Sequence, residues 1–394
     1  MSSSSTTMAA IWALAIIHLL LLLPLLRSSI VFELHGDVYP TGLFYVTMNI
    51  GEPAKPYNLD GPHEAYRPTP TNVVPCDDER CVAVHRDLGL AHDCTRNPDQ
   101  CDYVFGYKDG ESSLGVLLAD QFSLPTNNEN RPNLAFGCGY DQEGGQEAGK
   151  KLVEADGVLG IGRGTGDLVS QLKQQGIITD NIFGHCLGVH GGGFLFFGGD
   201  RVPSAGVTWV PMAQNVGSHY SPGAATLNLN VQLEYPVSME PMTTMFDSGS
   251  TYTYVHKDTY GRLISAVGVT LEGSSLTKVD DDALAECWEE NEPIQFVDDV
   301  KSKFKPLELT FGHGANQATM EIPPENYIVV TKTGKVCLGI LNGSQIGLDR
   351  LNLIGGNTMQ NYIMIYDNER ARIGWARASC YEMPGLEPLI GSRL

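Results

Sequence analysis

The stretch of residues 245–251 sets a carboxylate among side chains that can hold it. Residues 241–246 are apolar and predict a buried strand, and Asp247-Ser248-Gly249-Ser250 follows directly. A carboxylate at the end of a buried strand needs hydrogen bonds, which the flanking hydroxyls and the glycine amide can donate. Asp-Ser-Gly alone more often only reverses the chain. Asp247 is therefore a catalytic candidate only if the rest of the chain builds a site around it.

The composition favours an all-β protein of two domains. The chain has 394 residues, of which 44 are glycine and 22 are proline, as expected for many tight turns. Its formal net charge of -20 argues against nucleic-acid binding, which normally requires a basic patch. The acidity is compatible with an acidic or extracytosolic compartment and identifies no substrate.

The first 29 residues are typical of a secretory signal peptide. Residues 11–26 are almost wholly apolar and lead into Arg27-Ser28-Ser29. The alternative is a short membrane anchor, because the apolar run approaches the length that spans a bilayer. Asn342-Gly343-Ser344 is the one N-glycosylation sequon, and it has meaning only if the chain is secreted.

The nine cysteines are expected to form disulfides rather than metal sites. A secretory signal implies an oxidising compartment, and no two cysteines have the Cys-x-x-Cys spacing of a zinc site. The odd total leaves one thiol without a partner, or implies that a partner is missing.

The first half of the chain is predicted to be mostly β, with one short helix. Residues 68–100 are polar and cysteine-rich, and we interpret them as a surface loop region held by disulfides. The glycine-rich residues 156–162 lack the Gly-x-Gly-x-x-Gly spacing of a dinucleotide site. Strands are expected at 42–50, at 101–107 and 114–118 (a hairpin), at 134–138 and at 194–197, with the helix at 167–175.

The pattern restarts near residues 200–211, where a linker strand leads into the second half. A final hairpin of residues 362–367 and 373–376 is expected to close that domain. Each half carries an apolar-apolar-Gly element, Val158-Leu159-Gly160 and Leu353-Ile354-Gly355. This repetition predicts an internal duplication, and with it a second Asp turn in the first half. Further strands are expected at 251–255, 304–311 and 327–330, and a helix at 258–267.

Together these motifs resemble the pepsin-like aspartic proteases, and within them the plant nucellin-like group. The resemblance covers nearly everything from Tyr39 to Cys380. It is carried by Asp247-Ser248-Gly249-Ser250, Asp156-Gly157-Val158-Leu159-Gly160, Leu353-Ile354-Gly355-Gly356, and the tail from Ile365-Tyr366-Asp367 to Ile373-Gly374-Trp375.

The resemblance implies a bilobal all-β fold with a cleft between the lobes. Residues 37–200 would form the N-terminal lobe and residues 201–382 the C-terminal lobe. Each lobe of the family gives one catalytic aspartate on an Asp-Thr/Ser-Gly turn, with a hydrophobic-hydrophobic-Gly strand crossing beneath it. Two such carboxylates share a proton, so that one activates a water while the other polarises the scissile carbonyl.

By the same resemblance, the protein would be a monomer that acts on peptides or proteins without metal or organic cofactor. Asp247 would be catalytic, and Tyr107 on the flap hairpin, Gly249 and Ser250 would contact substrate. Cys287 would pair with Cys337. The expected location is the secretory pathway, outside the cell or in the vacuole.

The first half departs from the family pattern. The strand that should lead to the first catalytic turn, Tyr57-Asn58-Leu59-Asp60, runs straight into Gly61-Pro62. No Asp-Thr-Gly or Asp-Ser-Gly occurs before Asp247, and the cysteine-rich segment that follows this turn in plant relatives is absent too. Asp60 lies in the right strand to replace the lost aspartate, but no Ser or Thr follows it to hold its carboxylate. We expect Asp109 and Asp156 to be structural turn acids.

Two functions remain open. The chain is an aspartic endopeptidase by descent that has lost a segment through splicing or a gene-model error, and so is impaired as written. Alternatively, it is an inactive homologue that binds peptides or proteins in the cleft. A third hypothesis, a β-rich carbohydrate-binding protein, is supported only by the content of glycine and aromatic residues, which many other proteins share. An exon between the codons for Asp60 and Gly61 that encodes an Asp-Thr-Gly turn would favour the hypothesis of an endopeptidase that has lost a segment.

Overall fold

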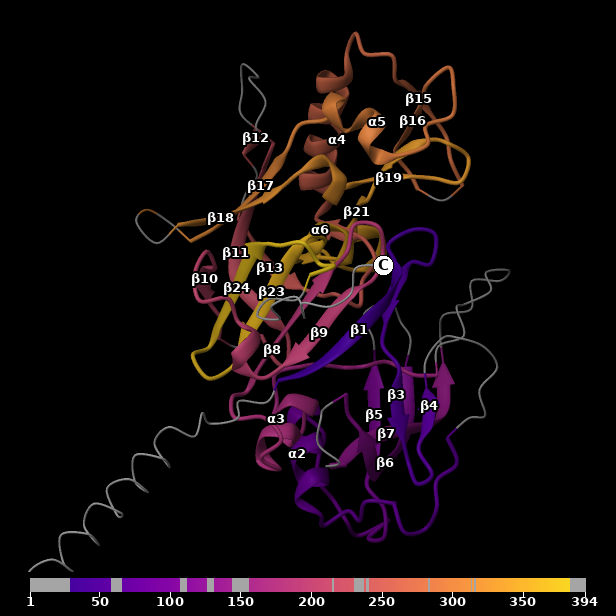
Figure 1. The fold of residues 1–394 in the computed structure, drawn as a ribbon, viewed down its shortest axis with the longest axis vertical. Helices are drawn as coiled ribbons and strands as arrows, with labels where there is room; N and C mark the ends of the chain where they lie inside the picture. Colours follow the sequence, from indigo (N-terminus) through magenta and orange to yellow (C-terminus); the bar gives the residue numbers. More distant parts are fainter. Residues whose placement is uncertain are drawn as a thin grey trace, which may run out of the picture.

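The protein is described here from a computed structural model and is mostly β (Figure 1). The structure describes residues 29–57, 66–106, 112–125, 131–143, 156–214, 216–229, 237–238, 241–282, 284–312, 314 and 317–382. Within these ranges no helix is both long and apolar enough to cross a membrane. The predicted signal segment lies outside them.

A seven-stranded sheet joins the two halves of the chain. Its order is β10 (Thr208–Pro211), β24 (Arg372–Arg377), β23 (Tyr362–Asp367), β8 (Ile182–Leu187), β9 (Gly193–Phe197), β1 (Ile30–Asp37) and β2 (Leu43–Tyr45). The final hairpin, β23 and β24, forms as predicted. It does not simply close the second half, because β23 also pairs antiparallel with β8 of the first half.

The second half adds an eight-stranded sheet and a smaller one. The larger sheet runs β18 (Ala318–Ile322), β17 (Leu307–Phe311), β11 (Tyr220–Leu229), β13 (Met242–Phe246), β22 (Leu351–Ile354), β14 (Thr253–Val255) and β21 (Ile340–Asn342), with β12 (Val237–Ser238) beside β11. The smaller one is β15 (Thr277–Val279), β16 (Cys287–Glu289), β20 (Val336–Leu338) and β19 (Ile328–Val330). Helix α4 (Lys257–Leu271) contacts β21, β11 and β12 of the larger sheet (Figure 1). The short elements are α5 (Val297–Val300), α6 (Gly356–Met359), η2 (Lys301–Lys303), η4 (Pro324–Asn326) and η5 (Gly343–Ile346).

The first half adds a five-stranded sheet at the opposite end of the molecule (Figure 1). It consists of β4 (Lys55–Tyr57), β3 (Met48–Ile50), β6 (Ser112–Ser123), β5 (Asp102–Gly106) and β7 (Asn133–Glu143). Strands β5 and β6 are the two sides of the predicted hairpin, whose tip lies outside the described residues. Helix α3 (Leu168–Gln174) lies where a helix was expected, and η1 (Gly199–Arg201) follows β9.

The interpretation of residues 68–100 as loop alone is wrong, because helix α2 (Glu79–Leu88) lies within them. The Asp78 side chain caps its first turn, and Gly89 ends it in the left-handed conformation, with φ of 69°. The helix buries only Cys81 and His85. Because these two residues do not make an apolar stripe, the polar composition concealed the helix.

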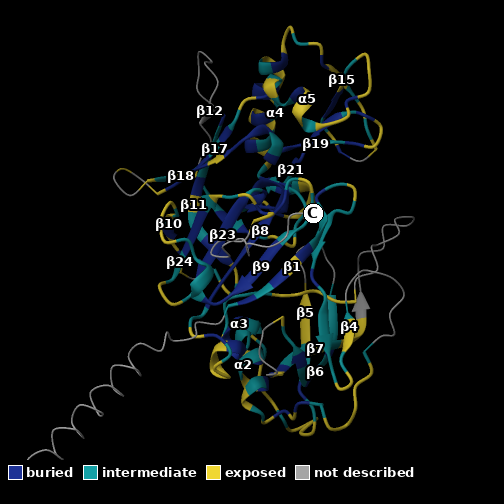
Figure 2. Ribbon diagram, in the orientation of Figure 1, coloured by how far each residue is buried: buried dark blue, intermediate teal, exposed yellow. Residues whose placement is uncertain are grey.

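One hydrophobic core runs through both halves, and the central strands are the most buried part of the ribbon (Figure 2). Four disulfides fasten its periphery: Cys76–Cys94, Cys81–Cys101, Cys186–Cys380 and Cys287–Cys337. The expected pairing of Cys287 with Cys337 is confirmed. Cys138 is left as a free thiol.

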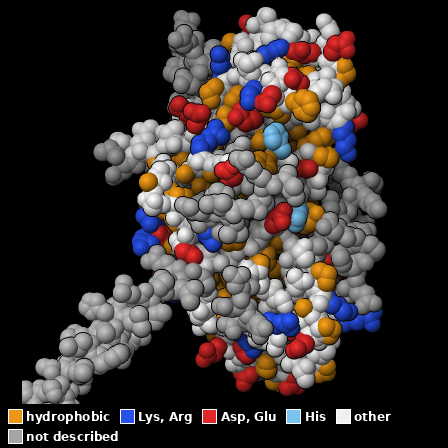
Figure 3. All heavy atoms as spheres, viewed as in Figure 1, with side chains coloured by type: hydrophobic (Ala, Val, Ile, Leu, Met, Phe, Trp, Pro, Cys, Tyr) orange, Lys and Arg blue, Asp and Glu red, His pale blue; other side chains and the backbone are white. Residues whose placement is uncertain are grey.

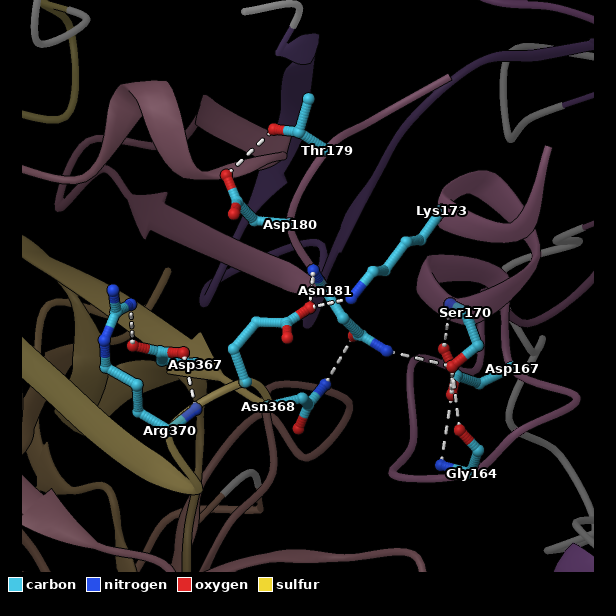
Figure 4. Close-up of polar contacts among 11 residues, drawn as sticks. Gly164, Asp167, Ser170, Lys173, Thr179, Asp180, Asn181, Asp367, Asn368 and Arg370 are labelled. Carbon is cyan, nitrogen blue, oxygen red and sulfur yellow. Dashed lines mark hydrogen bonds and ion pairs between the residues drawn. The ribbon is translucent and has the colours of Figure 1, made fainter. Parts of the chain in front are cut away.

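A polar junction fastens helix α3 to the turn between β23 and β24 (Figure 4). Asn181 donates to the Ser170 hydroxyl at 3.0 Å and accepts from the Asn368 amide at 2.9 Å. In the same turn, the buried Asp367 carboxylate accepts a hydrogen bond from Arg372 Nε at 2.8 Å. These bonds satisfy polar groups where the first half meets the end of the chain.

Candidate active site

Asp247 stands at the end of a strand that the core holds in place. Strand β13 lies parallel to β22, with Phe246 beside Ile354. The pairing continues one residue further, because the Asp247 amide donates to the Ile354 carbonyl at 3.0 Å. The backbone that carries the carboxylate is thereby fixed to the core.

The Asp247 carboxylate accepts a hydrogen bond on each oxygen. The Gly249 amide donates to Oδ1 at 3.0 Å, and the Ser250 hydroxyl donates to Oδ2 at 2.9 Å. The Ser250 amide closes the turn on the Asp247 carbonyl at 3.3 Å. These are the donors that the motif led us to expect, while the catalytic role of Asp247 and the substrate contacts of Gly249 and Ser250 stay predictions.

The apolar-apolar-Gly element of the second half passes directly beneath this turn. The Gly356 amide donates to the Ser250 carbonyl at 2.7 Å, and the Asn357 amide to the Thr251 carbonyl at 3.0 Å. A Cβ at Gly355 would lie 2.1 Å from the Tyr252 carbonyl oxygen, so only glycine fits there. The crossing strand predicted for the second half is thus present.

The floor near Asp247 is aromatic and uncharged. Tyr366 is buried and stacks on Phe183, with ring centroids 4.6 Å apart. Burial raises the pKa of its phenol, and electrostatic interactions with Tyr220 and Asp247 raise that pKa further. His185 lies beside it, with Nε2 3.4 Å from the Tyr366 hydroxyl. Burial lowers the pKa of His185 to about 4, so the imidazole is neutral at pH 7.

Sequence reasoning missed that the N-terminal segment reaches this turn. Thr251 donates to the Gly42 carbonyl. A small hollow beside the turn is lined by Val38, Gly42, Leu43, Phe44, Ser248, Thr251 and Gly356. No local signal in residues 38–44 indicates that neighbour, because the contact spans about two hundred residues of sequence. On the face in Figure 3, acidic and basic side chains are interspersed rather than gathered into a basic surface.

The matching element of the first half is not built in the same way. Residues 156–162 form no strand, and Val158 and Leu159 are 76% and 38% exposed. The corresponding Leu353 and Ile354 are only 9% and 1% exposed. The crossing strand that the family has in each lobe is thus present in the second half, while residues 156–162 form no such strand and no Asp-Thr-Gly or Asp-Ser-Gly precedes Asp247 in the sequence.

Three other residues singled out from the sequence cannot be placed. Asp60, Tyr107 and Asp109 lie outside the described residues. Asp156 is described and is exposed, two residues before Val158.

Comparisons with known proteins agree on the family and the fold. The family model described as Xylanase inhibitor N-terminal matches residues 58–199, and the one described as Xylanase inhibitor C-terminal matches residues 223–377. The chain is 45% identical over 406 positions to an aspartic proteinase of Oryza sativa subsp. japonica, with 95% of this chain and 98% of that protein covered. It is 27% identical over 321 positions to Aspartic proteinase 36 of Arabidopsis thaliana, covering 78% and 62%.

Two solved structures show the same fold at low identity. Basic 7S globulin from soybean has a TM-score of 0.68 at 16% identity, over 92% of this chain and 100% of that one. The aspartic proteinase from Irpex lacteus has a TM-score of 0.62 at 16% identity, over 89% and 98%. The predicted bilobal, pepsin-like fold is confirmed. The alignment with the rice protein has more positions than this chain has residues, so that protein has residues where this chain has none.

Proposed function

The chain belongs to the pepsin-like family of plant aspartic proteinases, and on that basis we propose that it is an endopeptidase-type protein with only half of the catalytic apparatus. The half that remains is Asp247. As written, the polypeptide hydrolyses peptide bonds very slowly or not at all.

The chemistry of the family explains why one half is not enough. A peptide is hydrolysed when one carboxylate removes a proton from the attacking water while a second, protonated one donates to the scissile carbonyl. Each such acid or base contributes about 10²–10⁴-fold to the rate. A lone Asp247 cannot be ionised and protonated at the same time.

Asp247 itself is set up to act as the base. Both of its oxygens accept hydrogen bonds, from Gly249 and Ser250, and these bonds fix the orientation of the carboxyl group. An ionised carboxylate on a turn fixed to the core can orient a water and take its proton. The acid that a bound peptide carbonyl requires would come from a second Asp-Thr-Gly or Asp-Ser-Gly turn, and no such turn occurs in the sequence before Asp247.

The observation that carries the proposal is the difference in burial between two apolar pairs: Leu353 and Ile354 are buried, whereas Val158 and Leu159 are exposed. The buried pair lies under an Asp turn, while no Asp turn among the described residues lies above the exposed pair. A family member with both turns would cover both pairs. The loss is therefore an entire strand and turn, not a single side chain.

Peptide or protein binding without hydrolysis is the second candidate function. It is favoured by the turn itself, which stays fixed to the core and keeps its hydrogen bonds although no matching Asp-Thr-Gly or Asp-Ser-Gly occurs earlier in the sequence. The protein would then hold an extended segment near Asp247 and release it uncut. Measured binding of a peptide without turnover, unaltered when Asp247 becomes Asn, would favour this function.

Several finer features belong to the same proposal. We place the protein in the secretory pathway as a monomer, outside the cell or in the vacuole, and in the nucellin-like group. Four disulfides support an oxidising compartment. The lobes would span residues 37–200 and 201–382, residues 1–29 would serve as signal or anchor, and Asn342 would carry a glycan. Tyr107 would cover the substrate from the hairpin tip.

The test compares three proteins on a denatured protein substrate at about pH 3 to 5, where a carboxyl pair can share one proton. The chain as written should show no cleavage above that of its Asp247→Asn variant. A version with a strand–Asp-Thr-Gly segment inserted between Asp60 and Gly61 should gain at least ~10²-fold, as expected for a restored acid–base group. Pepstatin-sensitive cleavage by the chain as written, abolished by Asp247→Asn, would overturn the proposal.

A further inference from the structure

Two histidines of the first half face each other at a distance that suits one metal ion. His85 Nδ1 and His92 Nδ1 are 3.1 Å apart, and their ring centroids are separated by 5.2 Å. Because zinc–nitrogen bonds are about 2.0–2.1 Å, two nitrogens bound to the same ion lie about 3.0–3.4 Å apart at ordinary coordination angles. The two nitrogens are thus already at ligand spacing.

The tautomer of His85 is fixed by a bond on the far side of its ring. Nε2 lies 2.7 Å from the Asp102 carbonyl oxygen, which can only accept, so Nε2 carries the proton. In the neutral imidazole Nδ1 is then unprotonated, so its lone pair is available to a metal ion or to a hydrogen bond from His92. Histidines that bind metals almost always donate their other N–H to a carbonyl, a carboxylate or water, which orients the ring and raises the basicity of the ligand nitrogen.

The backbone brings the pair together through the end of helix α2. His85 lies in the last turn of the helix, and Gly89 reverses the chain with φ of 69°. The Leu90 amide then donates to the His85 carbonyl at 2.7 Å, which turns His92 back over the helix end. A residue with a side chain at Gly89 would strain this left-handed turn.

Two disulfides hold the pair from either side. Cys81–Cys101 fastens helix α2 next to His85, and Cys76–Cys94 fastens the chain two residues beyond His92. The ring nitrogens lie close to the sulfurs: His85 Nε2 is 3.6 Å from Cys81 Sγ, and His92 Nε2 is 3.5 Å from Cys94 Sγ. Metal ions bind the thiolate form of cysteine, so these oxidised sulfurs serve as clamps rather than ligands. The imidazoles are held in place before any ion arrives.

We propose that His85 and His92 form a binding site for one borderline divalent transition-metal ion, such as Zn²⁺ or Cu²⁺. Imidazole nitrogen suits both ions, and Cu²⁺ binds more tightly than Zn²⁺ to a given nitrogen site. His85 is 6% exposed while His92 is exposed, so the ion would sit at the surface and complete its coordination with water. The sequence did not predict this site, because the cysteine spacing that signals zinc is missing and the nearby cysteines form disulfides.

The site is separate from Asp247 and needs no hydrolytic activity. It joins the end of helix α2 to the disulfide loop that follows, so a bound ion would stabilise the first half. The proposal therefore stands or falls independently of the proposed function.

The experiment uses the untagged, disulfide-intact protein in a Cys138→Ala background, since the free thiol would otherwise react with Cu²⁺. After chelator treatment, calorimetric titration with ZnCl₂ should show one saturable site, and Zn²⁺ should raise the melting temperature. With one equivalent of Cu²⁺, electron paramagnetic resonance should show coupling to two imidazole nitrogens.

The decisive variant is His92→Gln, because His92 is exposed and its loss should leave the fold intact. It should weaken Zn²⁺ binding at least tenfold and remove one nitrogen from the Cu²⁺ spectrum. His219→Gln, which removes an exposed histidine elsewhere, should change neither. Unchanged affinity in His92→Gln, or the absence of a stoichiometric site, would overturn the proposal and leave the pair as a shared hydrogen bond only.

Discussion

The amide of Asp247 donates to the carbonyl of Ile354, far later in the chain, at 3.0 Å. This bond fixes the Asp turn to the strand that crosses beneath it, and the first half has no counterpart among its described residues. The molecule thus offers an internal comparison, in which the same apolar-apolar-Gly pattern occurs once with a turn above it and once without.

That comparison predicts unequal effects for two alanine substitutions. Ile354→Ala removes a side chain that is 1% exposed and should lower the free energy of unfolding by about 2–4 kcal/mol. Leu159→Ala, at the matching position but 38% exposed, should change it by no more than ~0.5 kcal/mol. Urea denaturation followed by tryptophan fluorescence measures both. Equal losses would mean that the first element is covered in solution.

Ser250→Ala should impair the site without harming the fold. The substitution removes the 2.9 Å hydrogen bond to Asp247 Oδ2, so the carboxylate loses one of its two orienting donors. In the version with the first turn restored, kcat should fall about tenfold, the equivalent of one hydrogen bond of ~1.4 kcal/mol to a charged group, with KM nearly constant. Ser250→Thr, which keeps a hydroxyl, is the matched control and should retain most of the rate. A rise in KM of the same size, at constant kcat, would instead place Ser250 in ground-state binding.

The buried His185 should make the protein less stable in acid. Its pKa is about 4 in the folded protein against 6.5 for the free side chain, because burial disfavours the charged form. Between these values the unfolded chain binds a proton that the folded chain does not. The contribution of His185 to stability is therefore fully present above pH 6.5 and is lost as the pH falls toward 4, by about 3 kcal/mol in all.

His185→Gln should flatten this pH dependence. Urea midpoints measured at about pH 7, 5.5 and 4.5, which span the window between the two pKa values, would then differ less than in the unaltered protein. This holds even if the variant is less stable at neutral pH. The exposed His219→Gln serves as the control and should keep the full slope. An unchanged slope in His185→Gln would assign the acid sensitivity to other groups.

The Cys287–Cys337 disulfide should account for a measurable share of the stability of the second half. It closes a loop with a sequence separation of 50, and its removal should cost about 4 kcal/mol by the chain-entropy relation. The double variant to alanine is preferable to serine, because both sites are fully buried. Cys138→Ala, which breaks no disulfide, should shift the urea midpoint little. A midpoint shift of the same size in both would contradict the prediction.

Sequence-based prediction worked best where local signals coincide. The strand before Asp247, the turn and the Leu353-Ile354-Gly355 element each have a clear pattern, and the structure assembles them as expected. Prediction failed where the deciding contact is remote. Helix α2 buries a cysteine and a histidine rather than an apolar stripe, and its Cys81 packs in a small cluster with Val74, Cys101, Leu117 and Ala119, which come from other parts of the chain.

The pairing of the halves was equally out of reach of local pattern. The residues of β23 predict an apolar strand in any context, and none of them indicates β8 as its neighbour. The apolar types of Val158 and Leu159 predict core residues, yet both side chains are exposed. Such errors arise because the burial of a side chain depends on which segment packs against it. The residue pattern of one segment does not identify that neighbouring segment.

The Cys186–Cys380 disulfide, which joins strand β8 of the seven-stranded sheet to the residues after β24, can form only late in synthesis. Cys186 must wait for Cys380, 194 residues later, which at about 5–20 residues per second is about 10–40 s of synthesis. During this interval Cys186 is a reduced thiol in a chain that also contains the unpaired Cys138. The odd cysteine thus exposes the nascent protein to a wrong crosslink, and its yield on expression should depend on disulfide isomerase.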